Sequence, residues 1–182
     1  MRSNKFEIED IIEKYFEMYE RGMVCDIRVG TDSQLYSTEQ KRVHKFVTVA
    51  LLHYNSISMH YSGGDERVSL LWDRRTWVPG VQVNGIMHKM IEETVKTIEM
   101  AEELSKYVDK DCIILELDIN SKSHEASHVA LETCKGMCAG YGYPHVTWKP
   151  DAMITYAADN ICKARTFRKR KFRGIGRKGE DF

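Results

Sequence analysis

The chain has 182 residues, 42% of them hydrophobic, and its 27 basic residues balance 27 acidic ones. This length suffices for one domain with a sizeable core, and a net charge of zero gives no reason, by itself, to expect a nucleic-acid or membrane partner. The chain has no apolar run of membrane-spanning length, no secretory signal at its N-terminus, and no Cys-x-x-Cys pair among its five cysteines. The sequence therefore predicts a soluble, reduced, cytoplasmic protein.

The first predicted element is an amphipathic helix from Phe6 to Arg21 that ends at Gly22. Apolar residues recur on one side of this helix among acids and lysines. We predict that residues 1–22 pack on the outside of a domain formed by residues 23–167. Residues 168–182 are rich in basic residues and glycine, and we expect them to form a mobile tail.

Three strands are predicted next, joined by short turns. Cys25–Thr31 alternates apolar residues and is followed by Asp32, which we place at the end of this strand. A continuous apolar run follows from Phe46 to Tyr54, and an alternating segment from Ile57 to Tyr61. The short connections predict an antiparallel meander.

The stretch from Asp65 to Val83 is ambiguous. It interleaves arginines, among them Arg74 and Arg75, with two tryptophans. Such a pattern is typical of a surface that stacks on bases and contacts phosphates. It is equally compatible with a folded loop or a contact between subunits, and no other feature of the sequence specifies an oligomeric state.

Strands and helices alternate in the second half of the chain. Helical periodicity runs from Asn84 to Val108, and a strand follows from Cys112 to Asp118. We predict a helix over His124–Cys138, a strand over Tyr143–Trp148 and a last helix over Ala152–Phe167. Strands followed by strand–helix alternation predict an α/β fold with a mixed sheet and helices on both of its faces.

Four short motifs resemble the ribonuclease H-like superfamily and, more narrowly, the YkuK-type family of predicted bacterial nucleases. They are Val29–Gln34, Leu117–Asn120, Lys149–Ala152 and Ala157–Asn160. The resemblance covers roughly Cys25 to Ala164 and rests on the order and spacing of the motifs.

The resemblance implies a nuclease that hydrolyses phosphodiester bonds of RNA, an RNA–DNA hybrid or DNA with two bound Mg²⁺ or Mn²⁺ ions. Two such ions provide a nucleophilic water and stabilise the leaving oxygen, and both metals prefer oxygen ligands. By the resemblance, Asp32 would bridge the ions and Asp118 would be its neighbour on the adjacent strand. The structural alternative is that each aspartate only starts a turn or caps a helix.

The third acid should come from the long helix, where Glu92, Glu93 and Glu99 compete. At about 100° per residue, Glu92 and Glu99 fall on the solvent side, and Glu93 falls at the edge of the apolar stripe. A ligand directed at the open end of the sheet needs such a boundary position, so we select Glu93. The alternative is that all three are solvated surface acids.

The fourth acid is Asp159 or Asp151. Asp159 lies within a predicted helix, where aspartate is unfavourable, whereas helix capping explains Asp151. We select Asp159 and keep Asp151 as the alternative. Lys149 and the tail residues Arg168 and Arg170 are expected to bind substrate phosphates. The alternative is that Lys149 is an ordinary surface lysine and that the tail is solvated and unstructured.

A zinc hydrolase is a minor alternative, because His124-Glu125-Ala126-Ser127-His128 matches the His-Glu-x-x-His pattern. Leu131 and Cys134 occupy the positions at which the extended form of the motif has glycine and histidine.

The other alternative keeps the fold without the chemistry, as a module that binds nucleic acid or protein. Carboxylates that converge with room for two ions favour catalysis, and a lysine or arginine in that space favours binding alone.

Overall fold

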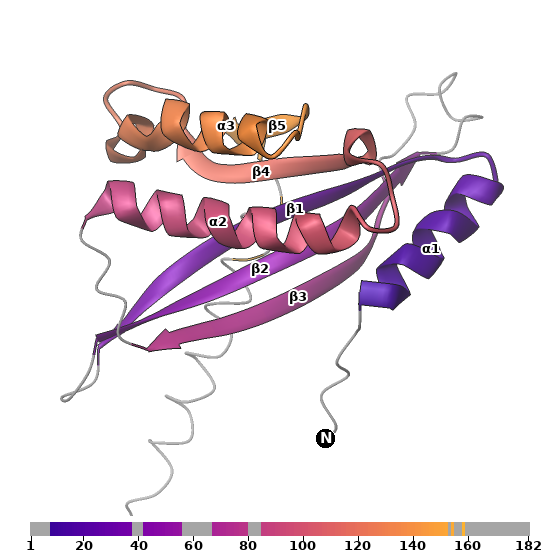
Figure 1. Cartoon of the computed structure of the whole chain (residues 1–182), viewed down its shortest axis with the longest axis horizontal. Coiled ribbons are helices and arrows are strands. Elements are labelled where there is room, and N and C mark those ends of the chain that lie inside the picture. The colour runs from indigo at the N-terminus through magenta and orange to yellow at the C-terminus, as the bar shows by residue number, and fades with distance from the viewer. Residues whose placement is uncertain are drawn as a thin grey trace, which may run out of the picture.

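The computed structural model describes residues 8–37, 42–55, 67–79, 85–152, 154 and 158. Within them the chain forms helices and strands in the predicted order (Figure 1). The elements are α1 (Ile8–Glu20), β1 (Val24–Ser37), β2 (Arg42–Asn55), β3 (Arg67–Pro79), α2 (Ile86–Leu104), β4 (Ile113–Asn120), α3 (Leu131–Gly140) and β5 (Val146–Lys149).

The strands form one mixed sheet in the order β3-β2-β1-β4-β5. β2 pairs antiparallel with β1 and with β3, whereas β4 pairs parallel with β1 and with β5. Parallel neighbours need a crossover connection, and α2 and α3 provide the two crossovers. The predicted mixed sheet is confirmed.

One strand prediction needs correction, and the ambiguous stretch contains a strand. β1 does not end before Asp32 but continues to Ser37, because β2 pairs with it along its whole length. The third strand is Arg67–Pro79, which lies within the stretch that the sequence left ambiguous. The predicted strand over residues 57–61 lies outside the described residues. β3 is specified by pairing with β2, a tertiary contact that local pattern does not report.

The helices agree with prediction more closely, with one exception. α1 ends at Glu20, and the predicted Gly22 follows with a φ of 74°, which allows the backbone N–H groups of Gly22 and Met23 to donate to the carbonyl oxygens of Tyr19 and Met18. The helix predicted from His124 begins only at Leu131, after a 3₁₀ turn over Ala126–Ala130. No helix in the described part of the chain is both long and apolar enough to span a membrane.

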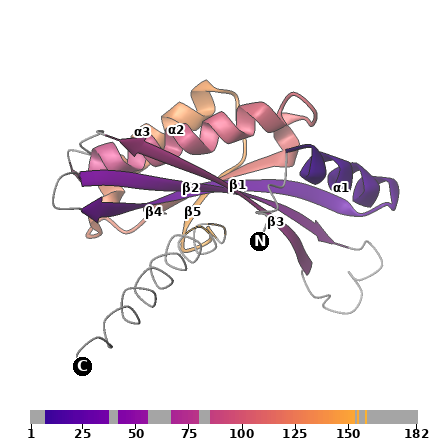
Figure 2. The same cartoon turned by 90° about the horizontal axis from the view of Figure 1, so that it is seen from below.

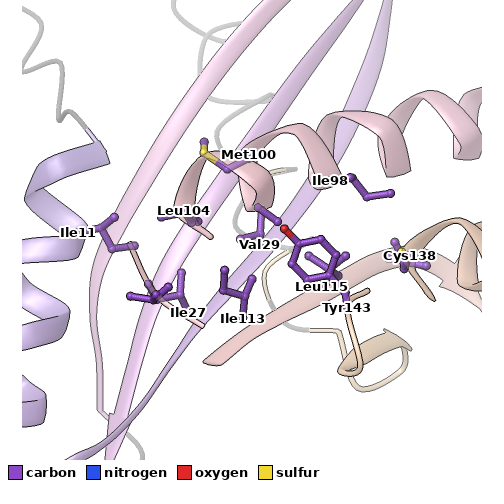
Figure 3. Close-up of a cluster of buried hydrophobic side chains, with 14 of the residues drawn as sticks. Ile11, Ile27, Val29, Ile98, Met100, Leu104, Ile113, Leu115, Cys138 and Tyr143 are labelled. Carbon is purple, nitrogen blue, oxygen red and sulfur yellow. The ribbon is translucent and has the colours of Figure 1, made fainter. Parts of the chain in front are cut away.

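The main core lies between one face of the sheet and the helices, and α2 and α3 cover the same face (Figure 2). Side chains from α1, β1, α2 and β4 meet there, as Figure 3 shows for ten labelled residues that include Ile11, Val29, Leu104 and Leu115. Cys138, on the buried side of α3, belongs to the same cluster.

The opposite face of the sheet carries a second, smaller cluster. Ile154 and Ala158, which are helical, pack there with residues of β2, namely Val47, Val49 and Leu51. Side chains alternate between the faces of a strand, so these residues point away from the main core. A Cβ added at Gly30 would lie 2.3 Å from Ile154 Cγ2, so glycine allows this close approach of the last helix to the sheet. Helices therefore cover both faces, as predicted.

Candidate active site

The site lies next to the point at which β1 and β4 stop pairing with each other. The parallel pairing of the two strands ends at Gly30 and Glu116, and Asp32 and Asp118 each follow two residues later. Because side chains on one strand face repeat every two residues, these two aspartates lie at the same level on neighbouring strands. Both aspartates lie within their strands, β1 at the centre of the sheet and β4 beside it, just beyond the last residues through which the two strands pair.

Glu93 joins them from α2. Glu93 is only 4% exposed, and its Oε1 accepts a hydrogen bond from Ser33 Oγ at 2.7 Å. The hydroxyl of Thr97 holds this part of α2 against β1, because it donates to Thr31 Oγ1 at 2.9 Å. Among the described residues, Glu93 Oε2 has no hydrogen-bond partner. Glu99, which competed with Glu93 in the sequence, has a side chain 53% exposed, whereas Glu93 lies on the buried side of α2.

Two lysines are inserted among the carboxylates. Lys89 Nζ lies 3.2 Å from Glu93 Oε1 and 3.8 Å from Asp32 Oδ1. Lys149 Nζ forms an ion pair with Asp118 Oδ1. The structure therefore brings Asp32, Glu93 and Asp118 together, and it places ammonium groups against all three.

The charges of the cluster act on each other. Burial raises the pKa of Glu93 to about 8; repulsion by Asp32 and Asp118 adds to the increase, while Lys89 and the hydrogen bond from Ser33 oppose it. Burial alone would lower the pKa of Lys89, but attraction by Glu93, Asp32 and Asp118 raises it. Each of the three acids is therefore close enough to act on Lys89.

The donor set fits a hard divalent cation. Three carboxylates supply oxygen ligands of the kind that Mg²⁺ and Mn²⁺ prefer, and Glu93 has a buried oxygen with no hydrogen bond from the described residues. As the side chains stand, no group of three or more acidic, histidine or cysteine residues in the described ranges is arranged to hold a metal. A cation could use these carboxylates only if the lysines moved.

The other predicted site residues fall in several places. Asp159, Arg168 and Arg170 lie outside the described residues, and Asp151 is exposed in the turn after β5. Arg74 and Arg75 lie on β3, opposite Thr48 and Val47 of β2.

The zinc-hydrolase alternative is wrong in its geometry. His124 lies before the 3₁₀ turn and is exposed against Glu125, while His128 lies within that turn. Two histidines bind zinc from positions i and i+4 only when an α-helix places them on one face. This segment is not α-helical, so the spacing does not bring them together.

Lys89 and Glu116 were missed by the sequence prediction. Lys89 could have been found, because it precedes Glu93 by one helical turn. Glu116 could not have been found from the sequence pattern of β4, because its partners are distant in the chain. It is fully buried, accepts a hydrogen bond from the backbone N–H of Ile154 at 2.6 Å, and pairs with Arg28 at 3.3 Å. Glu116 thus attaches the helical residue Ile154 to β4, beside the site.

Comparison with known proteins gives one match. A protein-family model described as "Ribonuclease H-like" matches residues 7–163. The match includes α1, which lay outside the resemblance seen in the sequence. No curated protein and no solved structure matches the chain.

Proposed function

The chain belongs to the ribonuclease H-like family, and from this premise we propose that it is a metal-dependent nuclease that hydrolyses phosphodiester bonds. Its substrate would be RNA, an RNA–DNA hybrid or DNA. Asp32, Glu93 and Asp118 would hold two Mg²⁺ or Mn²⁺ ions, with Asp159 as the fourth ligand and Asp151 as the alternative.

One observation carries this proposal: carboxylates from β1, α2 and β4 meet where the pairing of β1 with β4 ends. Burying acids close to each other costs free energy, because like charges repel and a buried carboxylate loses its hydration. The apolar core lies elsewhere and does not need them. Carboxylates that are held together at such a cost are typical of catalytic and metal-binding sites.

Bound divalent ions would supply a nucleophilic water at neutral pH and stabilise the leaving oxygen. The residues of the chain provide binding and orientation. Ser33 fixes the direction of the Glu93 carboxylate, and Thr97, one helical turn after Glu93, holds α2 against β1. Lys149, at the end of β5, would attract a substrate phosphate in exchange for its ion pair with Asp118.

The test is Asp32→Asn. We expect the variant to lose Mn²⁺-dependent cleavage of labelled RNA, hybrid and DNA substrates, because an amide is a poor replacement for a carboxylate ligand. Its circular dichroism spectrum and thermal midpoint should stay close to wild type. Asp111→Asn, an exposed change in the 3₁₀ turn over Lys110–Cys112 that precedes β4, is the matched control and should cleave normally. Full activity in the Asp32→Asn variant would refute the proposal.

A second candidate, a ribonuclease H-like module that binds nucleic acid or protein without cutting, is favoured by the lysines. Lys89 and Lys149 occupy positions beside the acids that a cation would need. If they are permanent counter-ions, the site does not bind metal. Calorimetric titration of the protein with Mn²⁺ separates the candidates, since an absence of binding at millimolar metal favours the module.

A further inference from the structure

The position of Lys89 in α2 is electrostatically unfavourable for a cation. Lys89 lies in the first turn of α2, where the helix dipole repels cations and favours acids. Lys89 also forms an i, i+4 ion pair with Glu93 in which the lysine comes first. This arrangement stabilises a helix less than a glutamate followed by a lysine. The helix itself therefore gives no reason for a lysine at this position.

The carboxylates give that reason. Lys89 Nζ contacts oxygens from two elements, Oδ1 of Asp32 on β1 and Oε1 of Glu93 on α2. Attraction by Asp118 on β4 also acts on it. One ammonium group thus interacts with all three acids of the cluster, which is the arrangement expected of a counter-ion shared by the site.

We propose that Lys89 is an exchangeable counter-ion, which neutralises the acidic cluster in the metal-free protein and competes with divalent cations for the oxygens of Asp32 and Glu93. This inference rests on the proposed metal-dependent function. The two occupants exclude each other, because an ammonium group and a divalent cation repel and need the same oxygens.

The side chain is able to leave. The side chain of Lys89 is 26% exposed, so part of it already reaches solvent, and its four-carbon stem has several rotatable bonds. By contrast, Glu93 is held by Ser33 and by the contact of α2 with β1, so this carboxylate keeps its position when the ammonium group moves. Lys89 thereby sets the metal concentration at which the site fills.

The experiment is Mn²⁺ calorimetry on the full chain with Lys89→Met, which removes the charge and keeps most of the volume. Lys96→Met is the matched control, because Lys96 lies two turns further along α2 and pairs with the exposed Glu99. We expect Lys89→Met to bind Mn²⁺ at least about fivefold more tightly than wild type, and Lys96→Met to bind within about twofold of it. The thermal midpoint of Lys89→Met should also rise more on addition of Mn²⁺ than that of wild type.

The outcomes separate this inference from the proposed function. Wild-type binding with equal or weaker binding by Lys89→Met overturns the counter-ion role and leaves the metal site standing. Binding by neither protein overturns both. Binding by Lys89→Met alone supports the counter-ion role and shows that the wild-type protein is held in the metal-free state. If Lys89→Met does not fold, Lys89→Gln provides the same comparison, because it removes the charge and still can donate a hydrogen bond to Glu93.

Discussion

Replacing Glu93 by glutamine should stabilise the metal-free protein at neutral pH. Burial raises the pKa of this carboxyl from an ordinary 4.5 to about 8. A carboxyl whose pKa is higher in the folded state favours folding only in its protonated form. Its contribution is fully present below the unfolded-state pKa and is lost as the pH rises towards the folded-state value. Glutamine resembles the protonated acid in shape and has no charge to bury.

The size of the effect follows from the difference between the two pKa values. Each pH unit in this window is worth about 1.4 kcal/mol, so the full difference corresponds to at most roughly 5 kcal/mol. Between about pH 5 and about pH 8, the free energy of unfolding of wild type should fall by roughly 3 kcal/mol more than that of Glu93→Gln. Lys89 does not contribute to this pH dependence, because its pKa is raised and it stays charged throughout the range.

The assay is urea denaturation in a chelating buffer, repeated across this pH range for both proteins. Glu99→Gln is the control, because Glu99 is on the same helix, pairs with a lysine and has a side chain 53% exposed. Its curve of unfolding free energy against pH should run parallel to that of wild type. If the Glu93→Gln curve also runs parallel to wild type, Glu93 is ionised in the folded protein and the reasoning about its burial is wrong.

Two further changes test how the last helix is positioned beside the site. Gly30→Ala should destabilise the protein by roughly 2 kcal/mol in the same denaturation assay, because the added Cβ would overlap Ile154. Gly136→Ala, in α3 with nothing within 4 Å of its added Cβ, should be neutral or slightly stabilising, and equal losses in the two variants would contradict the close approach. Glu116→Ala should cost roughly 3 kcal/mol, since it removes a buried acceptor from the Ile154 N–H and a buried partner from Arg28. A stability unchanged by Glu116→Ala would mean that this carboxylate does not hold the helix.

Local periodicity predicted much of the architecture and one part of the site. The order of elements, the mixed sheet and the approximate bounds of α1 and α2 follow from patterns that repeat every two or 3.6 residues. The choice of Glu93 over Glu99 came from the same periodicity, because the direction of a helical side chain depends on its position along the helix. Asp32 and Asp118 were selected from their motifs, and the structure places both at the same level on the adjacent strands β1 and β4.

Tertiary structure decided what depends on contacts between distant segments. β3 is a strand because it pairs with β2. Asp32 lies within a strand because β2 continues to pair with β1 beyond the last residue of β1 that pairs with β4. The pair of Lys89 with Glu93 could be read from one helical turn, but its contact with Asp32 required the register of β1 against α2. A sequence pattern reports which way a side chain points from its own element. Only the packing of the elements determines which charge it meets there.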